Sequence, residues 1–116
     1  MQARAISRYI RQSPQKMRLV IDEIRGKNVN DAYAILQFSK KRAATAIDKT
    51  LRSAVANARD QADQAGEVVD VDELYVKEAY VDEGPYYKRW RAAAMGRPAP
   101  IRRPTAHVTV VVDTKE

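Results

Sequence analysis

The segment that most constrains this chain is GPYYKRWRAAAMGRPAPIRRP, residues 84–104, which cannot belong to a hydrophobic core. It contains six Lys or Arg residues, no Asp or Glu, four of the five prolines and the only tryptophan. It separates two segments, 73–83 and 105–113, in which apolar and polar residues alternate as they do in β-strands. Structureless connections longer than about 12–15 residues are uncommon unless they are functional or disordered. We therefore expect this segment to leave the body of the protein.

Two conformations of this segment are compatible with its sequence. It is either disordered in the isolated protein, because its cations repel one another, or a two-stranded ribbon. About ten residues per arm at roughly 3.3 Å per residue would take such a ribbon about 30 Å beyond the body. An isolated ribbon is only marginally stable in water, so it would need an outside partner to hold it.

Apolar residues at helical spacing predict three helices. The first begins at Ser13-Pro14, a capping residue followed by a proline, and ends at Gly26. The second covers residues 28–38, with Asn28 as its cap, and the third covers about residues 41–64. The residues expected to face the core are Met17, Val20, Ile21, Ile24, Ala32, Ile35, Leu36, Ala43, Ala44, Ile47, Leu51, Ala54, Val55, Ala58 and Ala62.

Three segments, 3–10, 73–83 and 105–113, have the alternation of strands. The last is the clearest, and it places Ala106, Val108, Val110 and Val112 on one face. In the second, we expect Leu74, Val76 and Tyr80 on one face and Tyr75, Lys77 and Ala79 on the other.

The order of these elements predicts an α+β fold. We expect three helices packed on a small three-stranded antiparallel sheet, with a long protruding β-hairpin at about residues 83–104. A chain of 116 residues without a linker is one domain, residues 1–116.

Charge is distributed in blocks along the chain. The first 21 residues carry five cations and no acid, whereas residues 57–83 carry nine acids against two cations. This separation favours one face that meets a polyanion and another that stays in water. The chain contains no cysteine and no apolar run long enough for a signal peptide or a membrane span, so we expect a soluble cytoplasmic protein with no membrane partner.

The hairpin combines its cations with Tyr86, Tyr87 and Trp90. Cations neutralise phosphates, and aromatic rings stack on unpaired bases, so this combination is typical of nucleic-acid binding. The sequence thus predicts a nucleic-acid-binding surface that includes the hairpin.

Several long segments resemble one known family over essentially the whole chain. They are ARAISRYIRQSPQKMRLVIDEIRGK, SAVANA, LYVKEAYVDEGP followed by KR, GR, and the pattern T-x-HVTVVV near the end. With these segments the chain resembles the bacterial large ribosomal subunit protein twenty-two family. The resemblance implies a structural protein that binds large-subunit ribosomal RNA and assists assembly. It also implies a hairpin that lines the nascent-peptide exit tunnel, with the nascent peptide and neighbouring ribosomal proteins as further partners.

Matching positions carry the implied roles. Ser13, Pro14, Lys16 and Arg18 match the family's element at the start of the first helix. The hairpin matches at Glu83, Gly84, Pro85, Lys88, Arg89, Gly96 and Arg97, and the last strand at Thr105 and His107. The chain departs from the family at WRAAAM, residues 90–95, and at Pro98, Pro100 and Pro104.

Together, the residue pattern and the resemblance define two predicted sites. The predicted RNA-binding residues are Arg4, Arg8, Arg11, Ser13, Lys16, Arg18, Lys27, Lys40, Lys41, Arg42, Lys49, Arg52, Lys88, Arg89, Trp90, Arg91, Arg97, Arg102, Arg103 and His107. The predicted tunnel-lining tip comprises Lys88, Arg89, Trp90, Arg91, Ala92, Ala93, Ala94, Met95, Gly96 and Arg97.

Two other functions use the same residues. One is a free-standing RNA chaperone or regulatory RNA-binding protein, and the other is a small RNA-processing enzyme that uses His107 with a Lys or Tyr. His107 is the only histidine, and we expect it to be structural or to contact RNA. The acids Asp70, Asp72 and Glu73 lack the spacing of a calcium loop, so we expect a solvated loop there. No catalytic residue, metal or cofactor is predicted.

Overall fold

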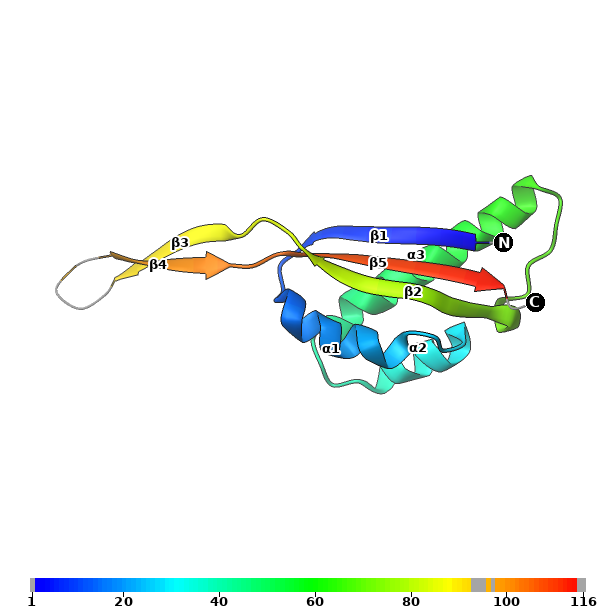
Figure 1. The fold of residues 1–116 in the computed structure, drawn as a ribbon, viewed down its shortest axis with the longest axis horizontal. Coiled ribbons are helices and arrows are strands. Elements are labelled where there is room, and N and C mark those ends of the chain that lie inside the picture. Colours follow the sequence, from blue (N-terminus) through cyan, green and yellow to red (C-terminus); the bar gives the residue numbers. More distant parts are fainter. Residues whose placement is uncertain (1, 93–95, 97, 115–116) are drawn as a thin grey trace.

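A computed structural model describes residues 2–92, 96 and 98–114, and for residues 89–92 and 98–102 it describes the backbone alone. The elements follow the expected order of strand, three helices, strand, hairpin and strand (Figure 1). They are β1 (Gln2–Ile10), α1 (Pro14–Ile24), α2 (Val29–Phe38), α3 (Ala43–Gln64), the 3-10 turn η1 (Val71–Glu73), β2 (Leu74–Glu83), β3 (Tyr87–Ala92), β4 (Pro98–Arg103) and β5 (Ala106–Thr114).

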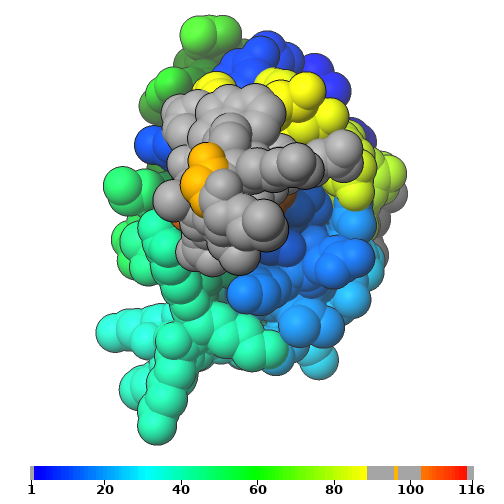
Figure 2. Space-filling view, turned by 90° about the vertical axis from the view of Figure 1, so that its left-hand side faces the viewer, coloured from blue at the N-terminus to red at the C-terminus, as the bar shows by residue number. Residues whose placement is uncertain are grey.

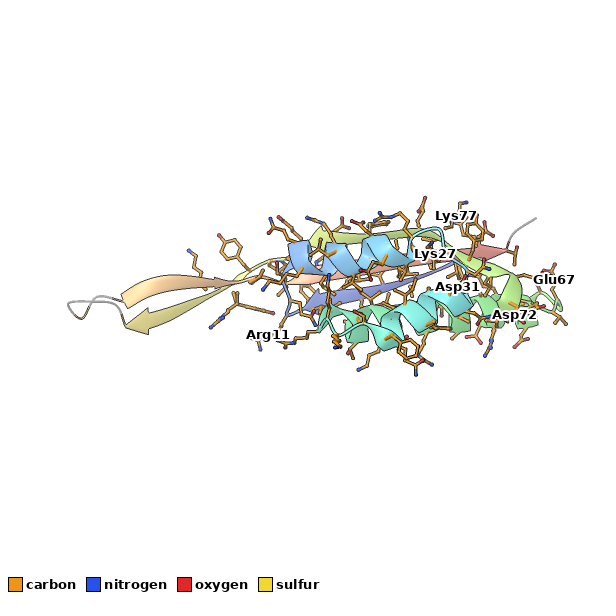
Figure 3. All side chains as sticks on the ribbon, turned by 90° about the horizontal axis from the view of Figure 1, so that it is seen from below. Arg11, Lys27, Asp31, Glu67, Asp72 and Lys77 are labelled. Atoms are coloured by element: carbon orange, nitrogen blue, oxygen red, sulfur yellow. The ribbon has the colours of Figure 1, made fainter. Side chains whose placement is uncertain are left out.

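The body is a three-stranded antiparallel sheet in the order β1-β5-β2, with the helices on one face of it (Figures 1 and 3). α3 packs across β1 and β5, and α1 packs against β2. Every residue expected to face the core from α1 and α3 is buried, and so are Ala32 and Leu36 of α2, whereas Ile35 is half-buried. The predicted α+β class is confirmed, because each helix places its apolar stripe on the sheet.

The last strand, β5, lies at the centre of the sheet and pairs with both neighbours. Ala106, Val108, Val110 and Val112 are fully buried against the helices, as their alternation predicts. On the other face, Thr109 and Val111 are each 3% exposed although no helix covers them. Side chains that stand across from them on β1 and β2 shield them, because cross-strand neighbours lie within contact distance.

One expectation about β2 is wrong, and a β-bulge explains the error. The pairing to β5 runs from Val76↔Val112 directly to Glu78↔Val111, so Lys77 is an extra residue. An extra residue reverses which side chains face the core beyond it. As a result Ala79 is buried and Tyr80 is 40% exposed, the reverse of a strict alternation through the whole segment.

The hairpin is a separate two-stranded sheet in which β3 pairs with β4 from Tyr87↔Arg103 to Ala92↔Pro98. Pro98 and Pro100 occupy alternate positions of β4, so their nitrogens, which carry no hydrogen to donate, face the same edge of the strand. The molecule measures 66 × 28 × 17 Å, and its radius of gyration is 17.6 Å. A compact domain of this length has about 13 Å, and the ribbon that projects from the body in Figure 1 accounts for the excess.

Polar contacts join the hairpin to the body where β2 ends and β5 begins. Gly84 N–H donates to the Thr105 carbonyl at 3.0 Å, and the Thr105 hydroxyl donates to the Pro85 carbonyl. Tyr9, whose φ is 58°, donates its N–H to His107 Nδ1 at 3.0 Å, and the two rings meet edge to face at 5.0 Å. These bonds fix the root of the hairpin against β1.

Gly84 has no room for a side chain in this root. A Cβ atom there would lie 2.5 Å from the Thr105 hydroxyl oxygen and 3.1 Å from two ring atoms of His107. We expect Gly84→Ala to lower the free energy of unfolding by about 1–3 kcal/mol, measured by urea denaturation, because Thr105 is β-branched and cannot rotate freely away.

A double-mutant cycle provides the control for this prediction. Thr105→Ala removes the atom in the way, so Gly84→Ala is expected to cost less in that background than in the wild type. Additive effects of the two substitutions would contradict the proposed crowding.

Candidate nucleic-acid interface

Cations and acids are unevenly distributed along the body, with Lys27 and Lys77 on the side away from the hairpin and Asp82 and Glu83 at the hairpin end of β2. Figure 3 shows Arg11 at the hairpin end, and Asp31, Glu67 and Asp72 at the opposite end. Lys27 also lies away from the hairpin end, so the structure separates it from the predicted RNA-binding residues at the starts of α1 and α3. A polyanion would therefore meet the hairpin end of the molecule most favourably.

At the hairpin end lies a groove of about 780 Å³ between the start of α1, the start of α3 and the returning arm of the hairpin. We call it the basic groove. It is lined by Arg11, Gln12, Ser13, Lys16, Leu19, Lys41, Arg42, Ala43, Arg103 and Pro104. Five of these residues are cations, and none of the described lining residues is acidic. The space-filling view in Figure 2 looks onto this end of the molecule.

Two helix N-termini contribute to the same groove. Within the described residues, the side chain of Ser13 before α1 makes no capping hydrogen bond to its helix, and neither does that of Arg42 before α3. Neither first turn carries an Asp or Glu to balance the helix dipole. Uncapped N–H groups and the positive ends of two dipoles bind anions, and phosphates fit best because surrounding cations add to the attraction.

The structure brings six of the predicted RNA-binding residues together in the basic groove: Arg11, Ser13, Lys16, Lys41, Arg42 and Arg103. Others are exposed outside it, with Arg4 and Arg8 on β1, Lys27 after α1, Lys40 between α2 and α3, Lys49 on α3 and Lys88 on β3. The predicted surface is thus one groove with dispersed cations around it.

Three predicted RNA-binding residues are engaged within the protein. Arg18 donates from Nε and Nη2 to the Val81 carbonyl at 3.2 and 3.0 Å. His107 accepts the Tyr9 N–H through Nδ1, which supports the structural interpretation of this residue. Arg52 pairs with Asp48 at 2.9 Å and lies over the Tyr33 ring at 5.0 Å.

The pKa values of Arg52 and Tyr33 are both raised. The hydrogen bond and charge of Asp48 raise the pKa of Arg52 above its usual value. Burial raises the pKa of Tyr33, and the positive charge of Arg52 partly offsets that effect. Arg52 is therefore an ion-paired cation on the exposed face of α3, outside the groove lining.

Part of the predicted hairpin site lies outside the described residues. This applies to Ala93, Ala94, Met95 and Arg97 as a whole, and to the side chains of Arg89, Trp90, Arg91, Ala92 and Arg102. Near the root, Tyr86 and Tyr87 are 47% and 39% exposed, and the Arg11 guanidinium lies 5.4 Å from the centre of the Tyr87 ring.

Sequence reasoning missed three features of this surface. Leu19 lines the groove with an apolar side chain that is 58% exposed, and Phe38 at the end of α2 is 82% exposed. Arg25 donates from Nε and Nη2 to the Ala79 carbonyl at 3.0 and 2.7 Å, beside the similar contact of Arg18. The helical position of Phe38, two residues beyond the buried Leu36, is the signal that could have revealed its exposure.

Among the described residues there is neither a metal site nor a membrane-spanning helix. No three His, Cys, Asp or Glu side chains gather as a metal site among the described residues. In the part of the chain that the structure describes, no helix is long and apolar enough to cross a membrane.

The fold and the basic groove define a class: a small α+β domain whose basic end and projecting ribbon suit a polyanionic partner. Residues 5–113 match the family model described as ribosomal protein L22p/L17e, and the chain belongs to this family. The resemblance found in the sequence is thereby confirmed, and this membership makes the chain a structural protein rather than an enzyme.

Full-length relatives share about half of its residues. The large ribosomal subunit protein uL22 of Bifidobacterium longum (strain DJO10A) is 52% identical over 116 residues, 100% of this chain and 98% of the relative. The protein of the same name from Desulfitobacterium hafniense (strain DSM 10664 / DCB-2) is 56% identical over 115 residues, 99% of this chain and 96% of the relative. That of Halothermothrix orenii is 49% identical over 116 residues, with 100% and 98% covered.

Lys16 and Arg18, two residues apart on α1, are expected to differ in role. Arg18→Ala should lower the free energy of unfolding by about 1 kcal/mol in urea denaturation, because it removes the donors to the edge carbonyl of Val81. Lys16→Ala should change stability by less than about 0.5 kcal/mol, since Lys16 is exposed in the groove. RNA affinity should show the reverse order, and equal stability losses in the two variants would contradict this assignment.

Proposed function

We propose that this protein is a structural constituent of the large ribosomal subunit that binds ribosomal RNA through the basic groove and the hairpin. Its family membership and the names of its relatives support the assignment to that subunit. The observation that carries RNA binding is the convergence of five cations and two uncapped helix N-termini in one groove. The protein is proposed to act in the cytoplasm, on the ribosome.

The proposed role of the groove is to hold the RNA backbone. Lysine and arginine side chains bind phosphates by charge, and the helix N–H groups donate hydrogen bonds to phosphate oxygens without regard to base sequence. Ordering the RNA around the protein in this way would assist assembly of the subunit, because each neutralised phosphate releases counterions and removes repulsion between RNA segments.

The hairpin is proposed to extend from the groove between RNA segments and to line the nascent-peptide exit tunnel. Support comes from its projection away from the body and from the cationic residue Arg103, which continues the groove onto β4. A two-stranded ribbon has little core of its own, so surrounding RNA and neighbouring ribosomal proteins would supply the contacts that hold it.

A charge reversal at the groove tests RNA binding. Arg42→Glu places an acid at the N-terminus of α3, where it stabilises the helix by about 0.5 kcal/mol, so any loss of binding cannot come from unfolding. We expect weaker binding to large-subunit ribosomal RNA and a salt dependence (log Kd against log salt) shallower by about one unit. The matched control is Arg59→Glu, the same charge change at an exposed position farther along α3. Equal losses of RNA affinity in both variants would contradict the proposal that the groove binds RNA.

The same variants separate a ribosomal constituent from a free-standing RNA chaperone. A constituent should sediment with the large subunit in high salt, and Arg42→Glu should reduce the amount retained. A wild-type protein that washes off readily would favour the chaperone.

Crosslinking tests the proposal that the hairpin lines the nascent-peptide exit tunnel. A photoreactive residue in place of Lys88 should crosslink to a nascent chain in stalled ribosomes, because β3 would lie along the tunnel wall. The same residue in place of Lys27, away from the hairpin end, should give no such crosslink. If neither position gave a crosslink, the proposal that the hairpin lines the tunnel would be wrong. The proposal that the groove binds RNA would be unaffected.

A further inference from the structure

Phe38 is an aromatic side chain that the fold directs outward. It is the last residue of α2 and is 82% exposed, whereas Val29, Ala32 and Leu36 of the same helix are buried. Two residues at 100° each place Phe38 about 200° around the helix from Leu36, on the side away from the core. The ring therefore contributes little to the stability of the fold.

Hydrogen bonds in the turn that follows α2 restrain the backbone that carries this ring. Ser39 N–H donates to the Leu36 carbonyl at 3.3 Å, and Lys41 N–H donates to the Ser39 hydroxyl at 3.3 Å. Ala44 N–H donates to the Lys41 carbonyl at 3.1 Å, at the start of α3. A connection of four residues that is bonded at both ends fixes the backbone that carries the ring before any partner arrives, which lowers the backbone entropy lost on binding.

The surroundings of the ring are cationic. Lys40, Lys41 and Arg42 follow it after Ser39, and the chain has no Asp or Glu between Asp31 and Asp48. Lys41 and Arg42 line the basic groove, so the backbone of Phe38, three residues before Lys41, lies next to the surface proposed to hold the RNA backbone. In Figure 2, side chains from the region around residue 40, coloured turquoise, stand out beyond the rest of the body.

We propose that Phe38 is a stacking site for an unpaired nucleobase of the RNA whose backbone lies in the basic groove. This inference rests on the proposed RNA binding and adds a recognition element to it. A base offers an apolar face to the ring, while its own phosphates meet the three cations. A protein partner would have to combine an apolar pocket for the ring with an acidic rim for the cations, whereas any unpaired nucleotide carries both features.

The test is a thermodynamic cycle between the ring and the base. The probes are a single-stranded adenosine RNA oligonucleotide and an abasic oligonucleotide of the same length and charge, titrated with the full-length protein at constant salt. Phe38→Ala should weaken binding to the adenosine oligonucleotide about tenfold, in line with the stacking of one base on an aromatic ring. It should leave binding to the abasic oligonucleotide unchanged. Equal losses for both probes, or no loss for either, would overturn the proposal.

Two further variants separate stacking from general apolar contact. Phe38→Tyr keeps an aromatic ring and should retain most of the affinity, whereas Phe38→Leu keeps an apolar side chain without a ring and should lose it. All three variants should unfold at the wild-type temperature because the position is exposed. Retained affinity in Phe38→Leu would overturn the stacking role.

Crosslinking in the assembled subunit distinguishes the class of partner. A benzoylphenylalanine at position 38 should crosslink to ribosomal RNA, and a crosslink to a ribosomal protein would overturn the proposal. Phe38 can fail these tests while Arg42→Glu still weakens RNA binding, in which case the groove stands without the stacking site. If Arg42→Glu bound RNA as tightly as the wild type, the proposal that the groove binds RNA would be wrong.

Discussion

The pairing of β5 with both β1 and β2 is the constraint on which the rest of the structure depends. This pairing joins the first strand of the chain to the last, and it closes the sheet over the apolar faces of α1 and α3. Because β5 is central, its valines are buried on both faces. The hairpin leaves the body where β2 ends and returns where β5 begins, so the same pairing fixes its root.

Placing β1 next to β5 also determines where the cations gather. β1 ends beside the hairpin root, and only residues 11–13 separate it from α1, so the positive end of that helix lies there as well. The turn between α2 and α3 brings a second helix N-terminus to the same groove. Acids in the groove would pair with the cations and cancel the field, but no described lining residue is acidic; Asp82 and Glu83, at the hairpin end of β2, are not among them.

Not every basic residue contributes to that field. Arg18 and Arg25 of α1 donate to the Val81 and Ala79 carbonyls on the outer side of β2, which protects the edge of the sheet from pairing with another chain. Arg52 is paired with Asp48. A count of cations in the sequence therefore overstates the charge available to a partner, and only the tertiary structure shows which cations remain.

The sequence by itself determined the helices, the strands, the α+β class and the projecting hairpin, because apolar periodicity and proline and glycine placement act locally. It also predicted six of the seven polar and charged residues that line the basic groove, all except Gln12, but not that they meet. The tertiary structure decided three things: the bulge at Lys77, which turns Tyr80 outward; the role of Arg18 as an edge donor; and the outward ring of Phe38. The first two depend on contacts between residues far apart in the chain, which no local pattern records. The spacing of Phe38 from Leu36 is local, but only the position of α2 against the core decides which side of that helix faces outward.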